Sequence, residues 1–191
     1  MQGLWAARWL ADVNGLGPDA LVQHMVAMAL GLGVGAFAIG AVAERLRRKG
    51  TDHESILVAA VMLFVAVELA MLSQTPIPSL VLWGLFAMFG GLTALTWAIL
   101  AAHFPRQLAA RAMTALAMAE MLGAFIVQSV FGWGLDFWPA TDGYYPFEAF
   151  HTLFLLLVLL QLGTLAWFYR DRALALLDRL ISRGDGGPER W

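Results

Sequence analysis

The stretch "VLWGLFAMFGGLTALTWAIL", residues 81–100, contains twenty consecutive positions without a charged side chain. A bilayer core of about 30 Å is crossed by about 20 residues of α-helix. Strands that span a membrane would show segments of about 10 residues with alternating polarity, and this stretch has no such alternation. The sequence therefore predicts a membrane-spanning helix here.

The rest of the chain repeats this pattern. Of its 191 residues, 60% are hydrophobic and only 14% are charged, with a mean hydropathy of +0.70. A soluble domain would be about 45–50% apolar and about a quarter charged. We therefore predict an all-α membrane protein with one transmembrane domain over 1–191. Its five spanning helices are expected at 21–42, 56–72, 80–102, 108–131 and 150–169.

The two ends of the chain are too short or too polar to span. Residues 1–20 carry two tryptophans, and we expect them to form the external end of a helix whose beginning is missing, followed by a loop. Residues 170–191 are expected to form a cytoplasmic tail. Within that tail, the spacing of apolar and charged residues from 172 to 181 predicts an amphipathic helix along the membrane surface.

The cations predict an orientation. Eleven of the twelve lysines and arginines fall between the first and second runs, between the third run and the first turn of the fourth, or after the fifth, and only Arg8 falls on the other side. Positive charge accumulates in cytoplasmic loops. We therefore expect a multi-pass protein of the inner (plasma) membrane, with its N-terminus outside and its C-terminus in the cytoplasm.

The segment "GAVAERLRRKG", residues 40–50, holds four of these cations. On charge alone it is a basic cytoplasmic anchor. The order of its residues also resembles the short loop motif of the major facilitator superfamily, with the tight turn moved to Gly50. The resemblance implies a charge relay with neighbouring helices that stabilises one access state. The matching residues are Gly40, Glu44, Arg45, Arg48 and Lys49.

A second stretch, "FPRQLAARAMTALAMAEMLGAFIVQSVFGWGLD", residues 104–136, resembles the eleventh helix of bacterial transporters of this superfamily. The resemblance implies the C-terminal bundle of a secondary transporter, lacking most of its first helix and the N-terminal half. Such transporters move small solutes around a midplane site, often with protons. The alternative is a free-standing membrane scaffold without transport activity, and whether the chain is a natural short protein or a fragment stays open.

Two acids lie at membrane depth. Glu120 is the midpoint of its run, and its neighbours at helical spacing are small, so we expect it to face a packed helix or a cavity rather than lipid. Glu68 lies nearer the end of the second run, where helix tilt or snorkelling would lower the free-energy cost of placing its carboxylate in the membrane. Burying a carboxylate costs about 2.5–3.5 kcal/mol on insertion scales. We predict Glu120, Glu68 and Gln128 as residues of a substrate or proton pathway, the alternative for each acid being a hydrogen-bonded tie between helices.

Other chemistry has little support in the sequence. Without cysteine the chain has no disulfide and no thiolate site. The four histidines are far apart, with no carboxylate at ligand spacing. We expect no metal, no cofactor, no enzymatic activity and no nucleic-acid partner. The expected partners are the lipid bilayer, a small-molecule solute and the missing N-terminal half, with self-association through the surface from Gly31 to Gly35 left open.

Overall fold

The computed structural model describes residues 4–184, whose regular secondary structure is helical. Five stretches are long and apolar enough to cross a membrane: α2, α3, α4 continued through α5, α6, and α7 as far as Arg170. The prediction of an all-α, multi-pass membrane protein with five spanning helices is confirmed. The elements are α1 Trp5–Asp12, α2 Pro18–Arg48, α3 His53–Leu72, α4 Ser79–Met88, the 3-10 turn η1 Phe89–Gly91, α5 Leu92–His103, α6 Arg106–Leu135 and α7 Phe147–Gly184.

The helices are longer than the apolar runs that predict them. The sequence predicted that α2 ends near Val42, but it continues to Arg48. Charged residues can extend a helix beyond the hydrocarbon, because cations favour its C-terminus and pair one turn apart. The turn follows at Gly50, whose φ of +92° confirms the predicted turn position. Asp52 then starts α3 by accepting a hydrogen bond from the Ser55 backbone N–H, at 3.0 Å.

The last helix also extends beyond its apolar run. Residues 170–184 continue α7 without a break, and the side chains beyond Arg170 are outside what the structure describes. The predicted amphipathic face at 172–181 therefore stays a prediction. The end of the predicted tail, 185–191, lies outside the described residues.

Helices α2 and α4 pack backbone against backbone at glycines. A Cβ atom at Gly31 would overlap the Gly84 carbonyl, and one at Gly35 would overlap the Met88 carbonyl. A Cβ at Gly91 would lie 2.6 Å from the Gly35 carbonyl carbon. Small residues allow such close approach between membrane helices. The predicted self-association surface at Gly31 and Gly35 is therefore wrong for these two residues, which contact α4 of the same chain.

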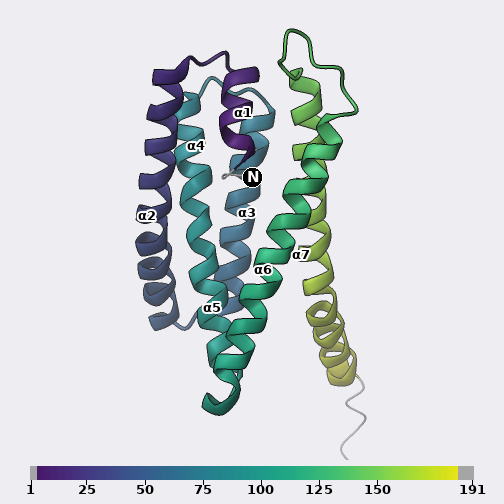
Figure 1. The fold of residues 1–191 in the computed structure, drawn as a ribbon. Helices are drawn as coiled ribbons and strands as arrows, with labels where there is room; N and C mark the ends of the chain where they lie inside the picture. The colour runs from purple at the N-terminus through teal and green to yellow at the C-terminus, as the bar shows by residue number, and fades with distance from the viewer. Residues whose placement is uncertain (1–3, 185–191) are drawn as a thin grey trace, which may run out of the picture.

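Aromatic side chains form the core at the end of the bundle that holds α1 (the α1 end). Trp9 of α1 lies at their centre, with ring centroids 4.9 Å from Phe154, 5.5 Å from Phe150 and 6.1 Å from Trp83. Figure 1 shows α1 at the same end of the molecule as the connection between α6 and α7. The opposite end holds the turn between α2 and α3 and is named here the Gly50 end. Residues 4–12 are thus an integral part of the bundle.

Helix α6 crosses the face of the molecule diagonally. In Figure 1 it runs from α5 at the Gly50 end to α7 at the α1 end. Much of its surface is uncovered: Met121 is 77% exposed and Phe125 is 69% exposed. Large apolar side chains exposed in this way fit a lipid environment or another helix bundle.

Candidate functional site

Glu68 is the most deeply buried acid at membrane depth. It lies on α3 and is 3% exposed. Its Oε1 accepts a hydrogen bond of 3.0 Å from Gln161 Nε2 on α7. Its Oε2 and the Gln161 Oε1 are both buried without a hydrogen-bond partner within residues 4–184. A helix–helix contact thus encloses Glu68 and an amide satisfies one oxygen, as in the alternative of a hydrogen-bonded tie between helices, and relief by tilt or snorkelling stays a prediction.

The burial of Glu68 beside a neutral amide makes the charged form of its carboxyl group unfavourable. A buried ionised carboxylate without a cation is costly, and within the described residues its one hydrogen bond comes from the neutral Gln161. Adding a proton removes the charge and turns one acceptor oxygen into a donor. The surroundings that Gln161 gives Glu68 therefore suit a carboxyl group that takes up and releases a proton. A groove of about 360 Å³ between α3 and α7 borders Gln161.

Glu120 has a different surrounding. It lies half-buried on α6, and the indole Nε1 of Trp97 on α5 donates to both of its oxygens, at 3.1 and 3.2 Å. The expected contact with a neighbouring helix is present. Gly123, one turn away, contributes nothing to it, since a Cβ there would meet no atom within 4 Å. Glu120 therefore lies at the edge of a helix contact and not inside a packed core.

Gln128 takes part in the structure through its backbone. The Trp5 indole donates to the Gln128 carbonyl at 3.2 Å, and the Trp5 ring lies 5.6 Å from Phe131. These contacts tie α1 to α6. Within residues 4–184, no hydrogen bond or ion pair joins Glu68, Glu120 and Gln128 to one another. The three candidate residues therefore lie at separate positions in the bundle.

The basic segment forms its ion pairs within α2. Arg47 donates through Nε and Nη2 to both Glu44 oxygens, at 2.9 and 3.0 Å, and Arg48 Nε donates at 2.9 Å. Arg45 and Lys49 are exposed. Arg47, which departs from the family motif, thus makes the bidentate contact. The relay with neighbouring helices that the resemblance implies stays a prediction.

A group of polar contacts around Asp12 at the α1 end, named here the Asp12 lock, was not expected from the sequence. Asp12, whose side chain is 1% exposed, accepts from Arg8 Nε at 2.8 Å and from the Tyr145 backbone N–H at 3.0 Å. Arg8 also donates to the Gly143 carbonyl and lies 5.3 Å above the Tyr145 ring. The lock holds the connection between α6 and α7 against α1. No local pattern indicates it, because it joins residues more than 130 positions apart.

The threonines near these acids bond locally. Thr96 donates to the Thr93 carbonyl at 2.7 Å, and Thr164 to the Gln161 carbonyl at 2.8 Å. This is the common behaviour of threonine inside a helix. By contrast, Gln161 and Trp97 are the partners of the two acids, and the sequence predicted neither pairing, although Gln161 is polar enough to line a pathway. A polar Gln161 inside an apolar run was the signal available for it.

The fold, with one buried and one half-buried acid, defines an all-α, multi-pass membrane protein with ionisable side chains at membrane depth. No protein-family model, curated protein or solved structure matches the chain. The likeness to the major facilitator superfamily therefore stays a prediction from the two quoted stretches.

Proposed function

We propose that this chain forms one bundle of a proton-coupled secondary transporter for a small solute, with Glu68 as the group that carries the proton. The observation behind the proposal is the carboxyl of Glu68, 3% exposed, with a neutral amide on one oxygen and no partner on the other within residues 4–184. Acids inside a membrane are costly and mark proton or substrate pathways. The proposal assigns the chain no covalent chemistry, so it is a carrier and not an enzyme.

The surface of α6 supports a second bundle as partner. Rocking transport requires two bundles with a site between them. Met121 and Phe125 leave a large apolar area uncovered, and Glu120 lies half-buried on the same helix. The family resemblance assigns this position to the N-terminal half of the transporter. We place the assembly in the plasma membrane with the Gly50 end in the cytoplasm, as the cation distribution favours.

The exposed α6 surface equally favours the alternative of a membrane scaffold. A scaffold needs docking surfaces but no titratable group in its core. Proton movement in a Glu68→Gln variant therefore distinguishes the transporter from the scaffold. Glutamine keeps the size of the side chain and its ability to bond Gln161, but it cannot release a proton in this range of pH.

The test uses membrane vesicles from the source cells, so that any natural partner is present. Vesicles from cells with the wild-type, Glu68→Gln or Glu148→Gln gene receive a panel of small solutes, and a pH-sensitive dye reports proton movement. Glu148 is an exposed acid at the start of α7 and is the matched control. An epitope tag verifies equal amounts of protein.

We expect at least one solute to drive proton movement in wild-type and Glu148→Gln vesicles, with its loss in Glu68→Gln vesicles. Proton movement that is unchanged in Glu68→Gln would reject Glu68 as carrier. A panel in which no solute gives a signal that depends on the chain would favour the scaffold.

A further inference from the structure

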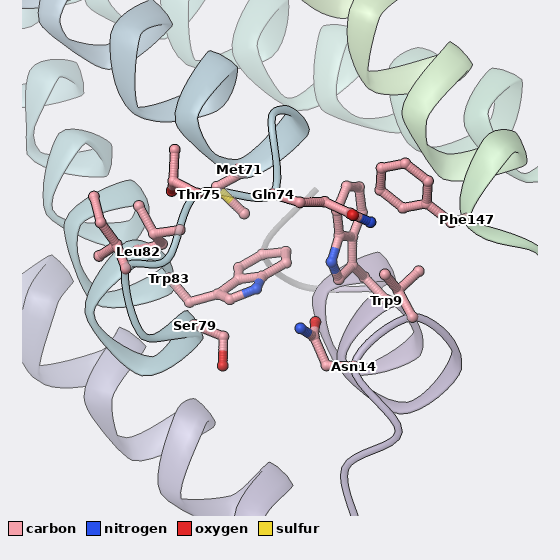
Figure 2. Close-up of a pocket in the computed structure, with 11 residues that line it drawn as sticks. Trp9, Asn14, Met71, Gln74, Thr75, Ser79, Leu82, Trp83 and Phe147 are labelled. Atoms are coloured by element: carbon pink, nitrogen blue, oxygen red, sulfur yellow. The ribbon is translucent and has the colours of Figure 1, made fainter.

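A cavity of about 260 Å³ lies at the α1 end, away from the Glu68–Gln161 contact. Figure 2 shows side chains from α1, from the turn between α3 and α4, from α4 and from the start of α7 around it. Ligand pockets for drug-sized molecules usually measure about 300–1,000 Å³, so this volume suits a smaller solute. Its lining consists of Trp9, Val13, Asn14, Met71, Gln74, Thr75, Ile77, Ser79, Leu82, Trp83 and Phe147.

Two indole N–H donors in this lining have no acceptor in the part of the chain that the structure describes. Trp9 is 4% exposed and Trp83 is 2% exposed, yet neither indole N–H has a hydrogen-bond partner within residues 4–184. Trp5 and Trp97, in contrast, both donate to protein oxygens. In Figure 2 both indole nitrogens are turned toward the space beside Asn14. Neither Nε1 is among the fully buried polar atoms that lack a partner, so both N–H groups reach the open space of the cavity and can donate to a molecule there.

Ser79 supplies an acceptor. His24 Nδ1 lies 2.8 Å from the Ala20 carbonyl, which can only accept, so in the neutral ring Nδ1 carries the hydrogen. His24 Nε2 then accepts from the Ser79 hydroxyl at 2.9 Å. The lone pairs of Ser79 Oγ are left for a donor in the cavity. At the rim, the amides of Asn14 and Gln74 can both donate and accept.

Gln74 is held in an unusual conformation. Its φ is +48°, in the left-handed region that non-glycine residues rarely adopt. Such conformations concentrate at ligand-binding segments, where the surrounding structure maintains them. Figure 2 shows the Gln74 side chain reaching across the cavity toward Trp9 and Phe147.

The lining also restricts the charge of the ligand. None of its eleven residues carries a charged side chain. A charged ligand would lose water without gaining a counter-ion, which is costly. A neutral molecule with hydroxyl groups can accept from the indoles, donate to Ser79 and lay its carbon face on the aromatic rings.

We propose that this cavity is a binding site for a small neutral hydroxylated solute of the monosaccharide or polyol class, with the indole N–H groups of Trp9 and Trp83 as its principal donors. The site is separate from the proton-carrying role of Glu68 and does not depend on transport.

The first experiment measures binding of glucose and of sorbitol to the purified chain in nanodiscs by titration calorimetry. Trp9→Phe and Trp83→Phe each keep an aromatic ring and remove one N–H. Trp133→Phe is the matched control, since Trp133 is 72% exposed and outside the lining. We expect saturable binding of at least one sugar, weakened roughly three- to tenfold by each cavity variant, as for one neutral hydrogen bond, and unchanged by the control.

Charged analogues and a second readout complete the test. Glucuronate and glucosamine should bind more weakly than glucose. Because the chain lacks cysteine, Asn14→Cys introduces a single thiol at the exposed rim, and bound sugar should slow its reaction with a maleimide, while Gln23→Cys on α2 should react at an unchanged rate. Absence of saturable binding of both sugars, wild-type affinity in both Trp9→Phe and Trp83→Phe, or preference for a charged analogue would overturn the proposal.

Discussion

Glu68 and Gln161 lie 93 positions apart in the chain and form the most enclosed polar contact at membrane depth. Hydrogen bonds between membrane helices average about 0.6 kcal/mol, but an unsatisfied buried polar group costs about 1–3 kcal/mol. The larger effect is therefore the loss of a partner. Gln161 therefore stabilises the bundle chiefly because it gives the buried Glu68 carboxyl a hydrogen-bond donor.

The stability prediction for this pair follows directly. Gln161→Leu removes the donor and leaves both Glu68 oxygens without a protein partner, so we expect the free energy of unfolding to fall by about 1–3 kcal/mol. Thr164→Val, which removes a hydroxyl bonded to its own helix, should cost less than about 1 kcal/mol. Denaturant unfolding in bicelles measures both. Adding Glu68→Leu to Gln161→Leu should recover part of the loss, and a double variant less stable than either single one would contradict this account.

At the scale of helices, the contact between α2 and α4 depends on the absence of side chains at a few positions. Gly31 and Gly35 meet α4 directly, whereas Gly33, on the same helix, has no atom within 4 Å of an added Cβ. The three glycines look alike in the sequence. Their different positions on the helix surface give them opposite tolerance to substitution.

Gly35→Ala should lower the free energy of unfolding by about 1–3 kcal/mol, because the added methyl group forces the two backbones apart. Gly33→Ala is the matched control and should be neutral or stabilising by up to about 1 kcal/mol, since alanine favours the helix. Thermal unfolding of the purified chain compares them. Equal effects of the two changes would show that α2 and α4 do not meet as described.

At the scale of the whole molecule, the bundle has two unlike ends. The α1 end holds the aromatic cluster and the Asp12 lock, and the Gly50 end carries the ion pairs of α2. Figure 1 places the turn after α2 and the connection before α7 at opposite ends. This arrangement makes the predicted orientation testable with two single cysteines.

Lys49→Cys and Ala140→Cys place a thiol at each end in a chain without cysteine. Both positions are exposed, and they avoid Gly50 and Gly143, whose positive φ angles disfavour other residues. In intact cells we expect an impermeant maleimide to label the thiol at 140 and not the one at 49, because the sequence assigns eleven of the twelve cations to segments predicted for the Gly50 side. Permeabilised cells should label both. The reverse pattern would invert the orientation.

Much of the fold could be predicted because a membrane helix satisfies its own backbone hydrogen bonds. Its presence therefore depends on its own residues, as the run from Val81 to Leu100 illustrates. The helix ends were less predictable, since Glu44 and Arg48 extend α2 by pairing outside the apolar run. Of the candidate site, the sequence identified the two acids at membrane depth but not their partners.

What the sequence by itself determined is the class of protein, the number of spanning helices and the presence of costly acids among them. Only the tertiary structure decided that Glu68 meets Gln161, that Glu120 meets Trp97, that Gly35 faces α4 and that Trp9 and Trp83 line one cavity. Hydropathy is a sum over one segment and requires no partner. Contacts between helices depend on how each helix is rotated and which neighbour it meets, and that is decided by the packing of the whole bundle.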